Sequence, residues 1–259
     1  MKARPAAVAG HFYPANSATL RRTVSALLAA APAAEEGAKA IIAPHAGYQY
    51  SGQTAACAYR LLERRRAQIR RVVLLGPAHR VYLRGMGLPS VDMFTTPLGD
   101  VSLDKDGIRQ ALEMPGTEIS DEAHAGEHSL EVHLPFLQTV LDDFQLVPIV
   151  VGDCPAAEVE AVLELLWGGD ETLVVISSDL SHFHSYETAR EIDANTTARI
   201  EARDSMLHGD EACGAHAVNG LMLAAKAHGL EVHTLEVTNS GDTAGDKHRV
   251  VGYGAYALA

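Results

Sequence analysis

Short, continuously apolar runs alternate with longer amphipathic stretches along the whole chain. Continuous runs rich in β-branched residues are typical of strands that are covered on both faces. Such runs predict strands at 39–43, 71–75, 146–151, 172–177, 231–238 and 250–258. The stretches between them predict helices at 17–30, 53–69, 105–114, 129–143, 156–167, 186–202 and 214–228. This alternation predicts an α/β fold in which helices flank a central, mostly parallel or mixed sheet.

The composition fits a single domain spanning residues 1–259, because there is no long linker, internal repeat or low-complexity tract. No run reaches the roughly 18 apolar residues that a membrane span needs, and no signal peptide is visible. The net charge of -12 argues against a nucleic-acid partner, since phosphate binding needs basic clusters. The three cysteines form no C-x-x-C pair, which is typical of a reducing compartment. We therefore expect a cytoplasmic protein without a membrane partner.

The loops that follow three of the predicted strands carry the candidate chemistry. His45 follows the strand at 39–43, His79 follows the strand at 71–75, and Asp179 follows the strand at 172–177. In open α/β sheets, ligands bind beside the carboxyl ends of the strands. A single loop histidine is most often solvated or structural, but two at equivalent strand ends favour a metal site or a catalytic pair.

The segment Ser177–His184 allows two interpretations. In the first, Asp179 or Ser181 caps the following helix. In the second, Asp179 coordinates a metal or orients a ligating imidazole, and His182 acts as a general acid or base. His184 is expected at the rim of such a site.

A dense ionisable cluster extends from His124 to His133 but lacks the H-E-x-x-H pattern of zinc proteases. Gly126 predicts that a helix starts near residue 127, where the helix dipole favours Glu127. We predict that His128 faces the substrate and that His124 and His133 are structural.

Cys213 lies where the helix at 214–228 should begin, a position that lowers a thiol pKa and favours the thiolate. The alternative, a small buried residue, is favoured when the sequence is taken alone. Cys57 and Cys154 are expected to be inert. The glycine-rich loop 241–245 lacks a phosphate-binding pattern and is either a lid or a plain connection between strands.

Six segments, in order along almost the whole chain, together resemble the Memo family, which includes the AmmeMemoRadiSam system protein B. They are RPAAVAGHFYP at 4–14, PHAGYQYSG at 44–52, GPAH at 76–79, EHSLEVHLPFL at 127–137, SSDLSH at 177–182 and the closing VGYGA. The resemblance implies a fold similar to the LigB-type (class III) extradiol dioxygenases. It also implies a metal held by His45, His79 and Cys213, with Asp179 and His182 as further polar residues of the pocket.

The resemblance makes a non-haem iron oxidoreductase our first functional hypothesis, with Fe(II) as the expected metal. A thiolate ligand departs from the two-histidine, one-carboxylate set of those dioxygenases, and it favours copper or zinc as well. His128 or His182 would transfer the proton, and Tyr48 and Tyr50 would line the substrate pocket. The alternatives are a non-catalytic module that carries a metal or binds a partner, and a zinc hydrolase.

The resemblance also bears on partners. Animal members of the family are associated with binding phosphorylated peptides, whereas the microbial family name implies a functional link to a radical-SAM protein. A small molecule or a peptide is therefore the expected substrate.

Overall fold

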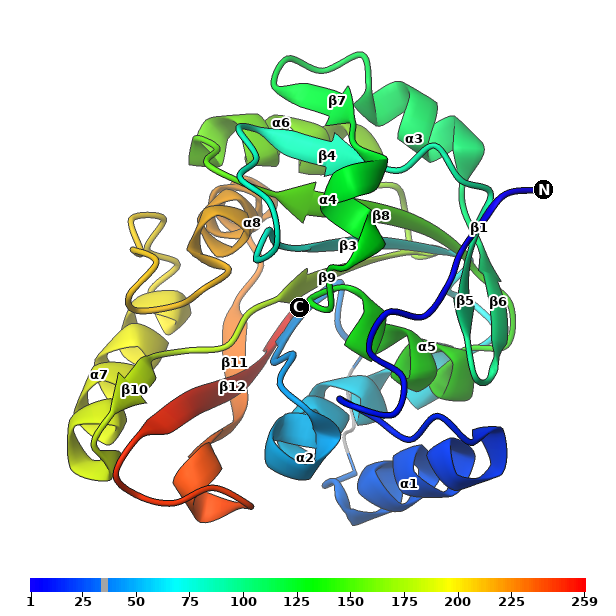
Figure 1. Ribbon diagram of the computed structural model, residues 1–259. Coiled ribbons are helices and arrows are strands. Elements are labelled where there is room, and N and C mark those ends of the chain that lie inside the picture. The colour runs from blue at the N-terminus through cyan, green and yellow to red at the C-terminus, as the bar shows by residue number, and fades with distance from the viewer. Residues whose placement is uncertain (34–36) are drawn as a thin grey trace.

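The computed structural model describes residues 1–33 and 37–259, and a nine-stranded mixed sheet runs through its centre (Figure 1). The strand order is β10-β12-β2-β9-β3-β8-β4-β7, and β11 pairs with β12. The middle of the sheet is parallel, from β2 through β9 and β3 to β8, whereas β12 and β4 run antiparallel to their neighbours β2 and β8. The six strands predicted from the sequence are confirmed as β2 (Ala40–Ala43), β3 (Arg71–Pro77), β8 (Gln145–Val151), β9 (Thr172–Ser177), β11 (Val232–Asn239) and β12 (Val250–Leu258).

Several short strands were not predicted, because their few residues are too polar or too small to form an apolar run. Three of them, β4 (Met86–Leu88), β7 (Thr117–Ile119) and β10 (His182–His184), extend the edges of the main sheet. Three others form a separate sheet in the order β1 (Ala3–Arg4), β5 (Met93–Thr96), β6 (Gly99–Ser102).

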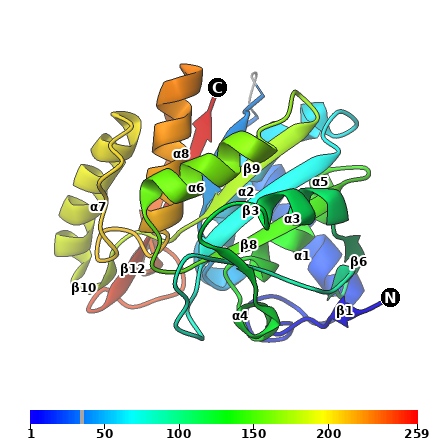
Figure 2. The same ribbon diagram turned by 90° about the horizontal axis from the view of Figure 1, so that it is seen from above.

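Helices cover both faces of the main sheet (Figure 2). One layer contains α1 (Ser17–Ala30), α2 (Tyr48–Arg60) and α5 (Leu134–Val140), with α2 against β2 and β12. The other layer contains α3 (Lys105–Ala111), α6 (Ala156–Leu166) and α8 (Ala215–His228), with α8 against β3 and β9. Helix α7 (Tyr186–Glu201) packs on β11 and β12. The predicted α/β architecture is therefore confirmed.

Burial on both faces explains why the central strands are continuously apolar. Val72–Leu75 of β3 and Leu173–Ile176 of β9 are completely buried. Full burial of each such side chain contributes about 1.5–3 kcal/mol to stability. Among residues 1–33 and 37–259, no helix is both long enough and apolar enough to cross a membrane.

One local prediction is wrong, and one of two open interpretations is excluded; both outcomes bear on the site. The short helix α4 (Asp121–Ala125) ends before Gly126, and the helix α5 begins only at Leu134, after the 3-10 turn η2 (Glu131–His133). Glu127 therefore lies in an irregular connection and not at a helix start. The residue that caps α7 is Ser185, whose side chain accepts a hydrogen bond from Thr188 N–H, and not Asp179 or Ser181. Strand β10 separates those two residues from the helix.

Candidate metal site

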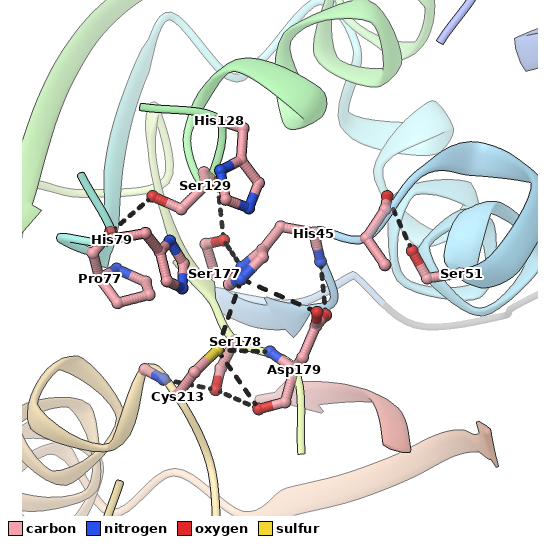
Figure 3. Close-up of polar contacts among 12 residues, drawn as sticks. His45, Ser51, Pro77, His79, His128, Ser129, Ser177, Ser178, Asp179 and Cys213 are labelled. Atoms are coloured by element: carbon pink, nitrogen blue, oxygen red, sulfur yellow. Dashed lines mark hydrogen bonds and ion pairs between the residues drawn. The ribbon is translucent and has the colours of Figure 1, made fainter. Parts of the chain in front are cut away.

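Three imidazole rings meet at the carboxyl edge of the central sheet (Figure 3). His45 follows β2, His79 follows β3, and His128 lies between α4 and η2. One ligand atom from each ring lies within 4.8 Å of the others. Because β2 and β3 both pair in parallel with β9, their ends deliver His45 and His79 to one place. These three histidines can hold a metal ion.

Hydrogen bonds fix the tautomer of His45. The hydroxyl of Ser177, the last residue of β9, donates its proton to the carbonyl oxygen of Ser129 at 2.6 Å. A hydroxyl has one proton and two acceptor lone pairs, so Ser177 accepts from both imidazole nitrogens that approach it. One of them is His45 Nδ1, at 2.6 Å. The proton of His45 is therefore on Nδ1, and Nε2 has a free lone pair.

The second imidazole on Ser177 belongs to His133, which is completely buried. Its Nε2 lies 2.8 Å from the Ser177 hydroxyl, and its Nδ1 accepts a hydrogen bond from the Tyr59 hydroxyl at 2.7 Å. Burial lowers the pKa of His133 to about 3, so the ring is neutral. This arrangement keeps Ser177 in the orientation that prepares His45 for a metal.

A carboxylate holds the proton of His79 on Nδ1, as Ser177 does for His45. Glu127 accepts hydrogen bonds from the His79 and Ser129 backbone N–H groups, at 2.6 and 2.9 Å, and its Oε1 lies 3.0 Å from His79 Nδ1. Burial alone raises the pKa of Glu127, but the bonds from His79 and Ser129 outweigh it and lower that pKa to about 2. Because an ionised carboxylate only accepts, His79 carries its proton on Nδ1 and presents Nε2. Carboxylate–histidine pairs of this kind are typical of metal sites.

His128 stacks on His79 with ring centroids 4.7 Å apart. Burial lowers the pKa of His128 to about 4, so the ring is neutral near pH 7. Its Nδ1 lies 3.2 Å from Glu127 Oε1, but it is buried without a hydrogen-bond partner among the described residues. An unsatisfied buried nitrogen beside two prepared imidazoles fits a site built for a ligand.

Cys213 and Asp179 approach His45 from the other side. The Cys213 Sγ and the Asp179 Oδ2 lie 3.4 and 3.8 Å from His45 Nε2. The turn that carries Cys213 packs closely on β9, since a Cβ on Gly214 would lie 2.5 Å from the carbonyl oxygen of Ser177. The two side chains are thus within reach of a cation held by His45.

The protein surroundings of Cys213 do not by themselves favour the thiolate. Helix α8 begins at Ala215, after Cys213, and burial followed by the charge of Asp179 raises the pKa of the thiol. Burial also raises the pKa of Asp179 to about 7, despite the hydrogen bond from His45 N–H. A bound metal ion would offset the cost of ionising the thiol.

A cavity of about 400 Å³ opens beside this cluster, and His128, Asp179 and His182 form part of its wall. His182 Nδ1 donates to the Leu180 carbonyl oxygen at 2.8 Å, which leaves its Nε2 as an acceptor. Tyr50 lines the cavity as predicted, but Tyr48 does not. The Tyr48 hydroxyl is instead buried against the Val132 carbonyl oxygen at 2.6 Å.

The structure brings six of the predicted site residues to one edge of the sheet, namely His45, His79, His128, Asp179, His182 and Cys213. The sequence prediction missed the orienting roles of Ser177, Glu127 and His133. A signal for Ser177 was present, because it is a polar residue at the end of a strand that is otherwise apolar after its first residue.

Replacement of Ser177 by alanine removes the shared acceptor of His45 and His133. We expect the affinity for Zn(II) or Fe(II) to fall by about tenfold, the lower end of the effect of such supporting groups. Chelator competition measures this affinity. Ser51→Ala is the control, because Ser51 is also buried but its hydroxyl bonds, among the described residues, only to the Ala46 carbonyl oxygen. Equal metal affinity in Ser177→Ala and the wild-type chain would contradict the role of Ser177.

His124 lies outside the metal cluster, as predicted, and it gives a separate test by pH. Burial lowers its pKa to about 4, and its Nε2 contacts the Gly87 carbonyl oxygen at 2.9 Å. As the pH falls, His124 therefore takes up a proton near pH 6.5 in the unfolded chain but only near pH 4 in the folded chain. This difference lowers the free energy of unfolding by about 3 kcal/mol as the pH falls from about 6.5 to about 4.

His124→Gln keeps a donor for Gly87 but does not titrate. Urea unfolding of the metal-depleted protein at pH 7 and pH 4 should therefore show a smaller loss of stability in the variant than in the wild type. An identical loss in both proteins would show that His124 is not the titrating group.

Comparison with known proteins places the chain in a family over almost its whole length. The family profile described as Memo-like protein matches residues 4–257. Proteins named MEMO1 family protein from Archaeoglobus fulgidus and Aquifex aeolicus are each 35% identical to this chain, over 95% and 98% of both sequences, respectively. The crystal structure of the uncharacterized protein JW3007 from Escherichia coli K12 matches with a TM-score of 0.52 at 13% identity, covering 83% of this chain and 98% of that one. This last likeness concerns the fold.

Proposed function

The chain belongs to the Memo-like protein family, and we propose that it is a mononuclear non-haem iron oxidoreductase that acts on an electron-rich, catechol-like molecule. The observation that carries the proposal is the paired presentation of His45 Nε2 and His79 Nε2, each with its proton held on Nδ1 by a buried acceptor. Two histidines and a carboxylate form the ligand set typical of Fe(II) oxygenases. In this proposal the third ligand position belongs to Cys213, and the carboxyl group of Asp179 lies beside it, 3.8 Å from His45 Nε2.

The residues present fit a single metal ion, because ligand atoms of His45, His79 and His128 lie within 4.8 Å of one another and His128 Nδ1 has no hydrogen-bond partner among the described residues. When bound, Fe(II) would supply a Lewis acid and a centre for activating O₂. In this proposal His182 accepts the substrate proton; support comes from its position in the cavity wall and from the hydrogen bond of its Nδ1 to Leu180, which leaves Nε2 as an acceptor. Ring-cleaving dioxygenation transfers both atoms of O₂ to the product, so the reaction needs no external reductant.

The third protein ligand in this proposal is Cys213, and His128 faces the substrate. Support comes from the 3.4 Å separation between Cys213 Sγ and His45 Nε2. A sulfur donor also suits copper or zinc, so a role in carrying those metals without turnover is the second candidate.

The test is anaerobic purification with metal analysis, followed by O₂ uptake of the Fe(II)-loaded protein with catechol. We expect about one metal ion per chain and one O₂ consumed per catechol, with a coloured ring-opened product. Absence of O₂ uptake across several catechols would overturn the oxygenase proposal. In that case, ester hydrolysis by the zinc form without oxygen would identify a hydrolase, and a retained metal without turnover would identify a carrier or binding module.

Two variants assign the third ligand. Cys213→Ser should lower the metal content, whereas His128→Gln should keep the metal and slow turnover. The reverse result would make His128 the ligand and Cys213 a neighbour of the site.

A further inference from the structure

The mouth of the cavity beside the metal cluster carries one permanently charged cation. Among the described residues that line this cavity, Arg249 is the only lysine or arginine. It lies at the end of the β11–β12 connection, next to the first residue of β12, and its side chain is exposed. His128, Asp179 and His182 line the same cavity, so an exposed guanidinium and the metal cluster face one space.

In the part of the chain that the structure describes, no carboxylate forms an ion pair with the guanidinium of Arg249. Asp246 is the nearby acid, but its Oδ1 accepts from the backbone N–H groups of His248 and Arg249, at 2.8 and 3.4 Å. Other arginines of the chain bond directly to acidic side chains, as Arg71 does to Asp104 at 2.6 Å. The guanidinium of Arg249 can therefore donate two parallel hydrogen bonds to a bound carboxylate.

The partner of Arg249 within the protein is an aromatic ring in an unusual position. The guanidinium carbon lies 4.9 Å from the ring centroid of Phe183. Phe183 is 61% exposed and has a φ of 64°, in the left-handed region that disfavours a bulky residue. The pairing of β10 with β12 is irregular at this point, between His182 and His184. The backbone conformation of Phe183 does not serve the core, and strained backbone positions of this kind cluster at ligand sites.

We propose that Arg249 and Phe183 form an anion subsite that binds the carboxylate of a planar, aromatic substrate whose other end reaches the metal cluster. Guanidinium and carboxylate match in a two-bond geometry, and the exposed ring offers a stacking face for a planar group. This inference rests on the proposed function for the metal end of the substrate, but the anion subsite itself depends only on Arg249, which lines the cavity, and on the ring of Phe183 beside it, which is not among the lining residues.

The test compares an acid with its neutral, isosteric amide. Zinc-loaded protein is titrated calorimetrically at low salt with 3,4-dihydroxybenzoate and 3,4-dihydroxybenzamide, and with the corresponding dihydroxyphenyl-propionate pair to vary the reach. We expect the acid of at least one pair to bind the wild type about tenfold more tightly than its amide, since one charge-assisted pair is worth roughly that factor. In Arg249→Gln the acid-to-amide ratio should fall to about 1.

Lys247→Gln is the matched control. Lys247 is a cation of the same loop, but its Nζ lies 4.2 Å over the ring of Tyr186 and the residue does not line the cavity. The ratio should be unchanged in this variant. Phe183→Asn, which keeps a residue that tolerates the left-handed conformation, should lower the ratio by about threefold. An equal ratio in the wild type and Arg249→Gln, or an equal loss in Lys247→Gln, would overturn the subsite.

A metal-free measurement separates this inference from the proposed function. If no dihydroxy compound binds the zinc-loaded protein, the metal proposal fails, and the subsite is then decided in His45→Ala with benzoate and benzamide. Benzoate should shift the Arg249 Nε–H resonance in an NMR spectrum, and benzamide should not. Equal shifts, or none, would overturn the subsite.

Discussion

Replacement of His45 by alanine is expected to abolish stable metal binding. His45 is the residue on which the cluster converges, because its Nε2 lies near Cys213 Sγ and Asp179 Oδ2 and its ring meets those of His79 and His128. Loss of a group that only orients a ligand costs about 10–100-fold in metal affinity, so loss of this ligand should cost more than about 100-fold.

Metal content after anaerobic purification, together with chelator competition, measures this loss. His233→Ala is the control, because His233 is an exposed histidine on β11 that does not line the cavity. Urea unfolding of the metal-depleted proteins tests whether His45→Ala keeps its fold. A folded His45→Ala protein with full metal content would contradict the proposed metal site.

Replacement of Glu131 by glutamine is expected to cause the largest loss of stability. Glu131 is completely buried and forms an ion pair of 2.7 Å with Arg4. It also accepts from the Ala7 and Val8 backbone N–H groups, at 2.8 and 3.0 Å, and from the Tyr13 hydroxyl at 2.6 Å. Removing its charge leaves Arg4 buried without a counter-ion, which should lower the free energy of unfolding by about 3–5 kcal/mol.

Urea unfolding at pH 7 measures the change. Glu63→Gln is the matched control, because Glu63 pairs with Arg60 where both side chains are partly exposed, at 35% and 31%, and the change should cost no more than about 1 kcal/mol. A similar small effect in both variants would show that the buried pair contributes nothing beyond an exposed one.

The Glu131 variant should also weaken metal binding. Arg4 donates to the carbonyl oxygens of His124 and Glu127, each at 2.6 Å. The N-terminal segment thereby holds the irregular connection that carries Glu127 and His128. Loss of the Glu131 charge loosens that connection. Glu127 should then orient His79 less well, and the metal affinity should fall.

Much of the fold followed from local pattern. Strands buried on both faces and amphipathic helices leave periodic signals, and all six predicted strands are present, from β2 to β12. The placement of His45, His79 and Asp179 together also followed from sequence, because parallel strands align their carboxyl ends. Short edge strands such as β4 and β10 gave no such signal, since they owe their conformation to pairing with neighbours.

The sequence by itself thus determined the α/β architecture and the two histidines at its functional edge. Only the tertiary structure decided what those histidines can do. Ser177 and Glu127 reach His45 and His79 across 132 and 48 positions of sequence, and their hydrogen bonds set which nitrogen is free. The direction of the Cys213 pKa shift follows in the same way, because burial and the neighbouring Asp179 raise it despite its place before a helix. Tautomers and pKa values depend on neighbours in space, and those neighbours are distant along the chain.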